Sequence, residues 1–246
     1  MRLQNKTAIV TGGGSGFGAG IVRKFVAEGA RVMVADIDAD AAAEVAREVG
    51  GVAHTVDVAY GPSVRAMAGA AIRALGHVDI LVNNAGITHL PTPMEDVSEE
   101  DFDRVFSVNC KSVYLTAKYL VPHMKSRSAG AILNVASTAG VSPRPRLNWY
   151  NASKGWMITA TRTMAVELAP MGIRVNAVNP VAGETPLLKS FLGEDTPEMR
   201  AKFLATIPIG RFSTPQDIAN AACYLCSDEA SMITGVAMEV DGGRCI

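Results

Sequence analysis

Apolar runs of strand length alternate with helical segments along this chain, and this alternation constrains the fold more than any other feature. TAIVTG is followed by GAGIVRKFVAEG, and RVMVADI is followed by DADAAAEVAREVG. Further runs rich in β-branched residues end in Gly, Asn or Asp, namely VAHTVDV, VDILVNNAG, GAILNVAS, IRVNAVNP and AMEVDGG. Continuous apolar strands between helices are typical of a parallel sheet covered on both faces. We therefore predict an α/β domain with a doubly wound parallel sheet.

The length of the chain favours a single domain over residues 1–246, because a chain of this size buries a large core and no linker-like stretch divides it. The segment 185–211 departs from the alternation. We predict that it is a helical insertion before the last helix and strand, and that it forms a lid over the substrate.

Charge and hydropathy argue against two classes of partner. The 23 Lys and Arg residues nearly balance the 24 Asp and Glu residues and form no basic run, so the charge pattern of a nucleic-acid-binding protein is missing. No stretch approaches the roughly 20 apolar residues of a membrane span, and the N-terminal MRLQNKTAIVTGG lacks the long apolar region of a signal peptide. We expect a cytoplasmic protein without nucleic-acid or membrane partners.

The cysteines and histidines show no metal-ligand spacing. The four cysteines are scattered rather than arranged as a disulfide framework, so reduced thiols are expected. Cys223 and Cys226 form a CxxC pair, but it lies in the helical pattern IANAACYLCSDEA and no second pair completes a zinc site. We interpret both as packing residues and predict no metal.

A glycine-rich run, TGGGSGFG, follows the first predicted strand and begins the first predicted helix. Gly12, Gly16 and Gly18 permit positive φ angles and a close approach of the backbone to a ligand. The free N–H groups and positive dipole at the start of a helix favour a pyrophosphate. In this position the run predicts the dinucleotide-binding loop of a Rossmann-like fold.

Asp36 ends the second predicted strand, 24 residues after Gly12. A carboxylate at roughly this position accepts hydrogen bonds from the adenosine ribose of a dinucleotide and repels a 2′-phosphate. Ile37 follows it and Ser15 lies in the glycine loop, so no Arg or Lys is placed to bind that phosphate. The sequence favours NAD over NADP.

Tyr150, Lys154 and Ser137 are the residue types that alcohol–ketone chemistry needs for its proton. Oxidising an alcohol removes a hydride and a proton, and a nicotinamide cofactor takes only the hydride. A phenol with an unperturbed pKa of about 10 is a poor base, but a nearby ammonium favours the phenolate. If Tyr150 begins a helix, the spacing of four places Lys154 on the same face, one turn away. Ser137 is a candidate to hydrogen-bond the substrate oxygen. The set predicts a hydride-transfer enzyme.

Together these residues closely resemble the short-chain dehydrogenase/reductase family, and the resemblance covers the whole chain. The matching motifs are Thr11, Gly12, Gly16 and Gly18 of the glycine loop, the adenine-contacting pair Asp57 and Val58, the run Asn83, Asn84, Ala85 and Gly86, and the catalytic set Asn109, Ser137, Tyr150 and Lys154. All four members of the catalytic set are present, which argues against a degenerate relative.

The resemblance implies a role for each catalytic residue. Tyr150 would be the general acid/base, Lys154 would lower its pKa and hold the nicotinamide ribose, and Ser137 would position the substrate oxygen. Asn109 would anchor a water that relays protons through Lys154. The residues expected to bind NAD are Thr11, Gly12, Ser15, Gly16, Phe17, Gly18, Asp36, Ile37, Asp57, Val58, Asn83, Ala85, Gly86, Tyr150, Lys154, Pro180 and Thr185.

One position departs from the family pattern. The family usually follows its sixth strand with Pro-Gly, whereas NPVAGET has Val181 after Pro180. We expect Val181 to narrow the approach to the nicotinamide. Thr185 still falls where the family binds the carboxamide.

Substrate contacts are expected from the loop VSPRPRLNW, from the residues after the Asn-Asn-Ala-Gly motif and from the lid segment. Arg144 or Arg146 is a candidate to pair with a carboxylate, sulfonate or phosphate, and the alternative is that both are solvated or subunit-contact residues. His89 is alternatively a rim or surface residue, and Trp149 and Leu188 are either pocket walls or core residues. The candidates are His89, Thr138, Arg144, Arg146, Trp149, Glu184 and Leu188.

Three alternative functions are compatible with this sequence. We favour an NAD(H)-dependent oxidoreductase that interconverts a secondary alcohol, or a related alcohol, and its carbonyl compound. A 3-oxoacyl-[acyl-carrier-protein] reductase is the alternative, but those enzymes usually use NADPH, and Asp36 and Ser15 count against it. A non-catalytic NAD-sensing protein on the same fold is a third, remote alternative, which the intact catalytic set argues against.

The quaternary structure is predicted from the resemblance and from two helices. The family is usually tetrameric, and the predicted helices 109–125 and 150–168 have apolar stripes broad enough for both a core and a partner. We expect a homotetramer, with a dimer as the runner-up.

Overall fold

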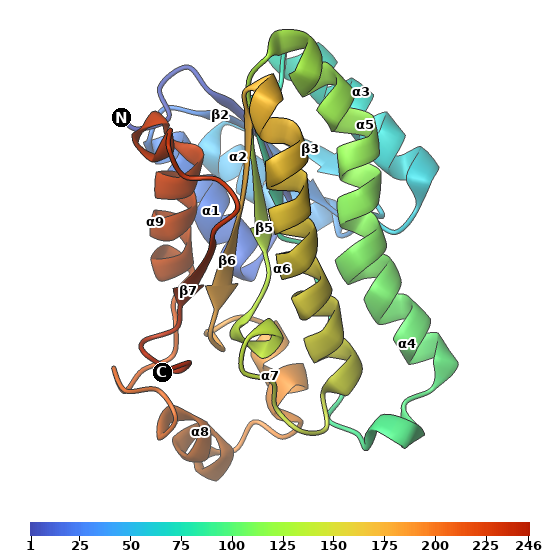
Figure 1. The fold of residues 1–246 in the computed structure, drawn as a ribbon, viewed down its shortest axis with the longest axis vertical. Helices are drawn as coiled ribbons and strands as arrows, with labels where there is room; N and C mark the ends of the chain where they lie inside the picture. The colour runs from blue at the N-terminus through green and yellow to red at the C-terminus, as the bar shows by residue number, and fades with distance from the viewer.

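The chain folds around a seven-stranded parallel sheet, described for residues 1–246 by a computed structural model (Figure 1). The strands pair in the order β3-β2-β1-β4-β5-β6-β7. They are β1 (Thr7–Thr11), β2 (Arg31–Asp36), β3 (Val52–Thr55), β4 (Ile80–Asn83), β5 (Gly130–Val135), β6 (Ile173–Pro180) and β7 (Ala237–Val240). Each strand lies in one of the predicted apolar runs, and the predicted fold class, a Rossmann-like doubly wound α/β sheet, is confirmed.

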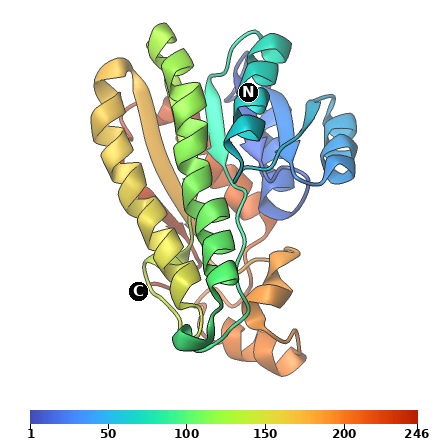
Figure 2. The ribbon, with the colours of Figure 1, turned by 90° about the vertical axis from the view of Figure 1, so that its right-hand side faces the viewer.

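Helices cover both faces of the sheet, with α5 and α6 on the face that Figure 2 presents. One face carries α1 (Gly16–Ala27), α2 (Ala39–Val49) and α9 (Pro215–Cys226), and the other carries α3 (Gly61–Leu75), α5 (Ser112–Arg127) and α6 (Asn148–Leu168), with α4 (Glu99–Phe106) before α5. Along β1, Ala8 and Val10 point into the apolar cluster beneath α1 and α9, whereas Ile9 points into the cluster beneath α3 and α5. Both faces are therefore buried, which explains why the strand is apolar at successive positions.

The order of the strands reverses at β1. Val10 of β1 is in register with Val34 of β2 on one side and with Val82 of β4 on the other. The chain first builds outward from β1 to β3, then crosses back and builds from β4 to β7. A crevice forms at the carboxyl ends of the strands where such a reversal occurs, so the loops after β1 and β4 border the expected ligand site.

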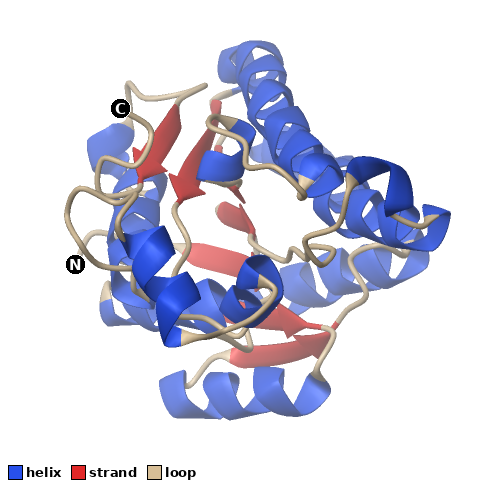
Figure 3. Ribbon diagram, turned by 90° about the horizontal axis from the view of Figure 1, so that it is seen from below, coloured by secondary structure: helices blue, strands red, loops and turns tan.

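The segment 185–211 lies beyond the carboxyl edge of the sheet and contains two short helices, α7 (Leu187–Leu192) and α8 (Pro197–Leu204). Both are at the bottom of Figure 1, and Figure 3 views the molecule from that side. Phe191 and Phe203 from these helices share an apolar cluster with Tyr150 of α6. The two helices therefore cover the end of α6 that carries the predicted catalytic tyrosine. Throughout the structure, every helix is too short or too polar to cross a bilayer.

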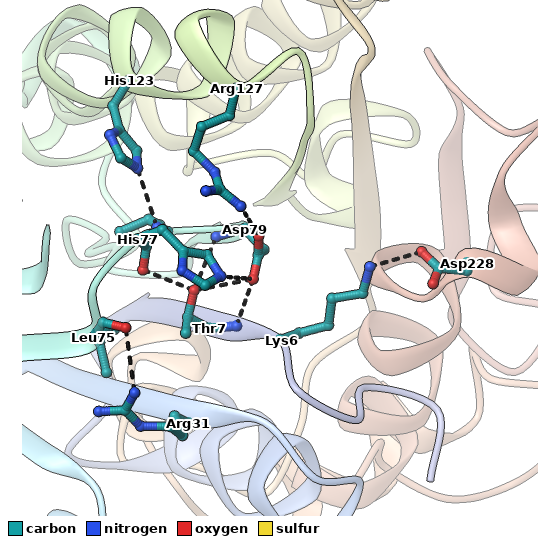
Figure 4. A network of polar contacts seen from close by, with 10 residues as sticks. Lys6, Thr7, Arg31, Leu75, His77, Asp79, His123, Arg127 and Asp228 are labelled. Carbon is teal, nitrogen blue, oxygen red and sulfur yellow. Dashed lines mark hydrogen bonds and ion pairs between the residues drawn. The ribbon is translucent and has the colours of Figure 1, made fainter.

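The amino-terminal edge of the sheet is tied together by Asp79, which precedes β4 (Figure 4). Its Oδ2 accepts hydrogen bonds from the backbone N–H of Thr7, at 2.9 Å, and from the Thr7 hydroxyl, at 3.1 Å. His77 Nε2 lies 3.0 Å from Oδ2 and Arg127 Nη2 lies 3.2 Å from Oδ1. This network joins β1, β4 and α5 at the edge opposite the lid.

Candidate active site

A cavity of about 470 Å³ lies at the carboxyl ends of β1 and β4, between the sheet edge and the lid. Of the residues predicted to bind the cofactor, those that line it are Gly12, Ser15, Gly16, Phe17, Asp36, Ile37, Asp57, Val58, Ala85, Gly86, Tyr150, Lys154, Pro180 and Thr185. Three others, Thr11, Gly18 and Asn83, are not in its wall. Ser137, Tyr150 and Lys154 of the predicted catalytic set line it as well, whereas Asn109 is buried behind it.

The glycine loop between β1 and α1 has the backbone that a bound phosphate requires. Gly12 and Gly16 have φ angles of 62° and 51°, which residues other than glycine rarely adopt. A Cβ on Gly12 would lie 2.9 Å from the Cα of Ala85, so the loop also packs closely against the segment after β4. Gly18 differs, because it is helical and its Cβ would lie 1.9 Å from the carbonyl oxygen of Gly12. It is required for packing within the loop rather than for a positive φ.

Asp36 ends β2 at the rim of the cavity. Its Oδ2 accepts a hydrogen bond from the Gly14 N–H at 2.8 Å, and its Oδ1 accepts one from the Asp38 N–H at 3.1 Å. These contacts fix the carboxylate against the glycine loop. Each carboxylate oxygen keeps lone pairs that can accept from a diol, and the negative charge at the rim opposes a phosphate there.

Thr11 and Asn84 join the glycine loop to the Asn-Asn-Ala-Gly segment. The Thr11 hydroxyl accepts from the backbone N–H groups of Asn84 and Ala85, at 3.1 and 3.2 Å. The Asn84 side chain donates to the carbonyl oxygens of Thr11, at 2.9 Å, and Gly12, at 3.0 Å. Thr11 therefore positions the loop from behind, and Asn84 lines the cavity. Asn84 was recognised as part of the motif but was not singled out as a site residue.

Asn83 belongs to a buried polar ladder beneath the cavity. Its amide donates to Asn134 of β5 at 2.9 Å, and its oxygen accepts from Thr116 of α5 at 2.9 Å. Asn134 donates in turn to Thr161 of α6 at 2.8 Å. Because each of these polar groups is paired, the ladder fixes α5 and α6 against the carboxyl half of the sheet.

Asn109 lies in a π-helical turn, Ser107–Lys111, between α4 and α5. Its Oδ1 accepts from the Ile87 N–H and its Nδ2 donates to the Ile87 carbonyl, both at 2.9 Å. The same Nδ2 donates to the Ser153 hydroxyl at 2.9 Å. A π turn widens the helix locally and is frequent at functional sites. Here it directs a buried amide at the segment after β4 and at α6, with one amide hydrogen donated to Ile87 and the other to Ser153.

Ser137, Tyr150 and Lys154 converge on one end of the cavity. Tyr150 is the third residue of α6, and Lys154 lies one turn later with its Nζ 5.9 Å from the centre of the Tyr150 ring. The Lys154 ammonium donates to the carbonyl oxygen of Val135 at 2.9 Å. The Ser137 hydroxyl follows β5 and accepts from the Ala139 N–H at 3.1 Å. The spacing of four on a helix thus places the phenol and the ammonium on the same wall.

Burial has the largest effect on the pKa values of both Tyr150 and Lys154. It raises the pKa of Tyr150 above its usual value, while hydrogen bonding toward Ser137 and the charge of Arg144 act in the opposite direction. Burial also lowers the pKa of Lys154 to about 8. The protein groups alone therefore leave the pKa of Tyr150 raised, in contrast to the lowering expected from Lys154.

The shape and lining of the cavity fit an extended dinucleotide. Asp36 ends β2 and Asp57 follows β3, on one side of β1, whereas Lys154 bonds to the end of β5 and Thr185 follows β6, on the other side. The backbone of the glycine loop lies between them, and a Cβ on Gly16 would come 3.2 Å from Thr185. An acceptor for a ribose diol, a glycine cradle for a pyrophosphate and a proton-transfer group thus follow one another along a single cavity.

Comparison with known proteins identifies the family. A family model described as enoyl-(acyl carrier protein) reductase matches residues 12–244. The chain is 50% identical, over the full length of both proteins, to 4-formylbenzenesulfonate dehydrogenase TsaC1/TsaC2 of Comamonas testosteroni. The chain belongs to the short-chain dehydrogenase/reductase family. The predicted family is therefore confirmed.

Two further relatives show the range of this family. The crystal structure of a 3-ketoacyl-(acyl-carrier-protein) reductase from Brucella melitensis, complexed with NADH, has a TM-score of 0.95 and 50% identity, and the match covers 99% of this chain and 100% of that one. 7alpha-hydroxysteroid dehydrogenase of Escherichia coli (strain K12) is 40% identical over 99% of this chain and 95% of its own. As a short-chain dehydrogenase/reductase, this chain is an oxidoreductase that acts on small molecules.

Short-chain dehydrogenases/reductases usually have glycine after the proline at the end of this strand, and this chain has Val181 there. Val181 is buried and lines the cavity, and its carbonyl accepts from the Ser213 hydroxyl at 3.1 Å. Gly183 lies two residues later, where a Cβ would come 2.3 Å from the Phe17 ring and 2.8 Å from the Ser213 hydroxyl. The position at which only glycine fits is therefore Gly183. Val181 adds an apolar wall.

Segment 185–211, the predicted lid, contributes Leu188 and Phe191 to the cavity wall. The Phe191 ring packs edge-on against Tyr150, with the ring centres 5.9 Å apart and the planes at 75°. Arg144 stacks on the same ring, with its guanidinium carbon 4.4 Å from the ring centre. Phe191 lay within the segment predicted to be a lid, but no spacing or motif pointed to this residue.

The remaining substrate candidates lie outside the cavity wall. Trp149 donates to the carbonyl of Met94 at 3.1 Å, and the exposed Arg146 donates to the carbonyl of Pro91 at 3.3 Å, so both brace the loop after β4. His89 is buried, its Nδ1 lies 2.8 Å from the Leu90 carbonyl oxygen and its Nε2 has no partner. The other two candidates are Thr138, which is buried, and Glu184, which is exposed.

Proposed function

We propose that this short-chain dehydrogenase/reductase is an NAD(H)-dependent enzyme that interconverts a secondary alcohol, or a related alcohol, and its carbonyl compound, with Tyr150 as general acid/base. The observation that supports this most is that the side chains of Ser137, Tyr150 and Lys154 line the same cavity as Asp36 and the glycine loop. Proton-transfer groups and a dinucleotide cradle in one cavity suit hydride transfer to or from an alcohol carbon.

The proposed proton path begins at the substrate hydroxyl. The substrate oxygen accepts a hydrogen bond from Ser137, and the Tyr150 phenolate takes the hydroxyl proton. A nicotinamide cofactor held in this cavity would supply the acceptor for the hydride from the carbon that carries this hydroxyl. For reduction, Tyr150 returns its proton to the carbonyl oxygen as the new C–H bond forms. The positive charge of Arg144 favours the phenolate against the burial that raises the pKa of Tyr150. We assign the same effect to the ammonium of Lys154, which lies 5.9 Å from the centre of the Tyr150 ring.

Lys154 has two proposed roles in this scheme. Its ammonium holds the nicotinamide ribose, for which its remaining N–H donors are available beside the bond to Val135. It also carries protons onward from Tyr150. The Lys154 Nζ lies 3.3 Å from the position of a Cβ on Gly86, and Asn109 Oδ1 lies 3.4 Å from the same position. Both side chains therefore border the same space beside Gly86, and this supports a relay between Lys154 and Asn109 through one water in that space.

The preference for NAD over NADP is proposed from Asp36. Its carboxylate faces the cavity and is held by Gly14 and Asp38. Ser15 and Ile37, the neighbouring residues at the rim, carry no charge that would stabilise a 2′-phosphate. NADH in the related structure from Brucella melitensis supports the same preference.

The 3-oxoacyl-[acyl-carrier-protein] reductase remains the second candidate. The name of the structural relative at 50% identity favours it, whereas the name of the sequence relative at 50% identity favours an aromatic aldehyde or alcohol. The 40% identical hydroxysteroid dehydrogenase favours a secondary alcohol on a ring. The two candidates differ in a testable way, because the reductase would accept a 3-oxoacyl thioester.

The decisive experiment follows NADH absorbance with NAD and NADP in parallel. We expect oxidation of aromatic and other secondary alcohols with NAD, and little turnover with NADP. Rapid reduction of an acetoacetyl thioester, together with no alcohol oxidation, would replace the first candidate by the second. NAD binding without turnover of any substrate would instead support the NAD-sensing alternative.

We also propose a homotetramer that acts in the cytoplasm. Two helices that lie side by side at the front of Figure 2, α5 and α6, carry exposed apolar side chains. They include Tyr114, Trp156 and Val166, of which Val166 is 80% exposed. Exposed apolar side chains of this kind favour burial against a second copy. Light scattering after gel filtration distinguishes a tetramer from the dimer.

A further inference from the structure

Arg144 is a partly buried cation without a carboxylate partner. It lies in the loop before α6, and its guanidinium carbon is 4.4 Å from the centre of the Phe191 ring and 4.7 Å from that of Phe203. Its Nη2 donates to the carbonyl of Phe191 at 3.2 Å. No Asp or Glu oxygen lies within 4.0 Å of it. Of the five N–H donors of a guanidinium, one is therefore used by this carbonyl.

A second arginine lies beside it. Arg244, near the end of the chain, has its guanidinium carbon 5.8 Å from the centre of the same Phe203 ring. It too forms no ion pair with a carboxylate. Burial and the positive charge of Arg244 both lower the pKa of Arg144. Two like charges around one phenyl ring repel each other, and an oxyanion placed between them would relieve that repulsion.

Arg144 is also close to the reacting end of the cavity. The ring of Phe191 contacts both Arg144, at 4.4 Å, and the catalytic Tyr150, at 5.9 Å between ring centres. The guanidinium and the phenol are thus separated by no more than one phenyl ring. A benzene ring that carries an alcohol at one end and an anion at the other spans a similar length.

We propose that Arg144 and Arg244 form an anion subsite for the substrate, which binds a carboxylate or sulfonate on the side of the molecule remote from the reacting alcohol. This inference rests on the proposed function and names its substrate class as anionic aromatic alcohols. Phe191, which lines the cavity and covers Arg144, turns aside to admit the anion. The planar fork of Arg144 then pairs with two oxygens of the anion, and Phe203 keeps the fork in place.

Arg146 is the matched control, because it is two residues away in the same loop but faces elsewhere. It is exposed and donates to the carbonyl of Pro91 at 3.3 Å. A sequence argument does not separate it from Arg144. The two arginines therefore differ in position but not in charge or residue type.

The test compares the binding of 4-acetylbenzenesulfonate, 4-acetylbenzoate and acetophenone to the protein–NAD complex, in which a ketone is not reduced, by calorimetry. We expect the anionic ketones to bind at least about tenfold more tightly than acetophenone, as charge-assisted hydrogen bonds provide. In Arg144→Gln and Arg244→Gln this ratio should fall toward one, whereas Arg146→Gln should keep the ratio of the unmodified protein. Arg144→Lys should restore part of it, because the charge returns without the fork. The two anions distinguish a carboxylate site from a sulfonate site.

Three outcomes would overturn the subsite. They are an unmodified protein that does not favour the anions, an Arg144→Gln ratio equal to that of the unmodified protein, and an Arg146→Gln ratio that falls as far as that of Arg144→Gln. Turnover of 1-phenylethanol with NAD is measured separately. Turnover of this neutral alcohol without anion preference would contradict the subsite alone. Tight, Arg144-dependent anion binding without turnover of any alcohol would support the subsite and contradict the proposed reaction.

Discussion

The ammonium of Lys154 donates a hydrogen bond to the carbonyl of Val135 at 2.9 Å, which anchors it at the end of β5, and it lies 5.9 Å from the centre of the Tyr150 ring. Lys154 is almost wholly buried, and the pKa of its ammonium falls to about 8 for that reason. The pair therefore joins the sheet to α6 at the cost of burying a charge, and this cost has a measurable pH dependence.

Replacing Lys154 by methionine should stabilise the protein at neutral pH. The unfolded pKa is 10.5 and the folded pKa is about 8, so between these values the unfolded chain binds a proton that the folded chain does not. The free energy of unfolding of the unmodified protein therefore rises as the pH increases from about 8 to 10.5, by on the order of 3 kcal/mol. The advantage of Lys154→Met, largest below pH 8, should shrink toward pH 10.5 in urea titrations.

An exposed lysine on α5, Lys118, provides the control for this titration. Lys118→Met removes the same charge from the surface, and its stability relative to the unmodified protein should change little with pH. A Lys154→Met curve that runs parallel to that of the unmodified protein would show that Lys154 keeps its ordinary pKa.

Removing the Tyr150 hydroxyl should abolish turnover without abolishing cofactor binding. General acid/base groups contribute roughly 10²- to 10⁴-fold to a rate, so Tyr150→Phe should lower kcat by about a thousandfold. NADH fluorescence titration should show an affinity close to that of the unmodified protein. The exposed Tyr114 of α5 is the control, and Tyr114→Phe should keep full activity. An active Tyr150→Phe variant would assign proton transfer to another group.

Changing Asp36 should shift the cofactor preference toward NADP. In Asp36→Ala the charge that opposes a 2′-phosphate is gone, and the Gly14 N–H loses its acceptor. We expect the ratio of kcat/KM for NADP to that for NAD to rise about 10- to 100-fold, with some loss of NAD affinity. Asp40→Ala removes a nearby exposed carboxylate on α2 and should leave the ratio unchanged. An unchanged ratio in Asp36→Ala would place the selectivity elsewhere.

Adding a methyl group at Gly183 should disturb the glycine loop through Phe17. The new Cβ would lie 2.3 Å from the Phe17 ring, so Gly183→Ala should destabilise the protein by about 1–3 kcal/mol and weaken NADH binding. Phe17→Leu makes room, and the double variant should be more stable than the two single changes predict. Gly155→Ala, whose Cβ meets only a contact at 3.8 Å, should be tolerated. Simple additivity would show that the two residues do not clash.

Asp79 should contribute to stability and not to catalysis, because its network is at the edge of the sheet opposite the cavity (Figure 4). Its side chain is only 17% exposed and accepts from Thr7. Asp79→Ala should lower the free energy of unfolding by about 2 kcal/mol. Asp228, which pairs with Lys6 at the surface in the same view, is the control, and its loss should cost at most about 0.5 kcal/mol. A large fall in kcat for Asp79→Ala would contradict this assignment.

The sheet and the main wall of the cavity were predictable because their signals are local. The central strands are apolar runs bounded by turn residues, since both of their faces are buried. The edge strands β3 and β7 are partly exposed but follow the same pattern of turn residues at their ends. Gly12 and Gly16 were identifiable because their φ angles suit glycine, and the spacing of Tyr150 and Lys154 follows from the pitch of a helix. Gly18 belongs to the same motif, but glycine is required there for close packing rather than for a positive φ.

The substrate end of the site depends on contacts that sequence spacing does not contain. Arg144 and Arg146 have the same side chain and lie two positions apart, yet one stacks on Phe191 and the other binds the carbonyl of Pro91. Arg244 comes 100 residues after Arg144 and approaches it only through Phe203. His89 followed a family motif but is buried outside the cavity wall.

The sequence by itself therefore determined the fold class and the family, and it predicted the glycine loop and the proton-transfer set, because each depends on residues close together in the chain and on the regular geometry of one strand, turn or helix. Only the tertiary structure decided which lid residue covers Tyr150, which arginine is near it and where the required glycine after β6 lies. Those features depend on side chains brought together from distant segments, and their positions are set by packing between elements rather than by the local backbone.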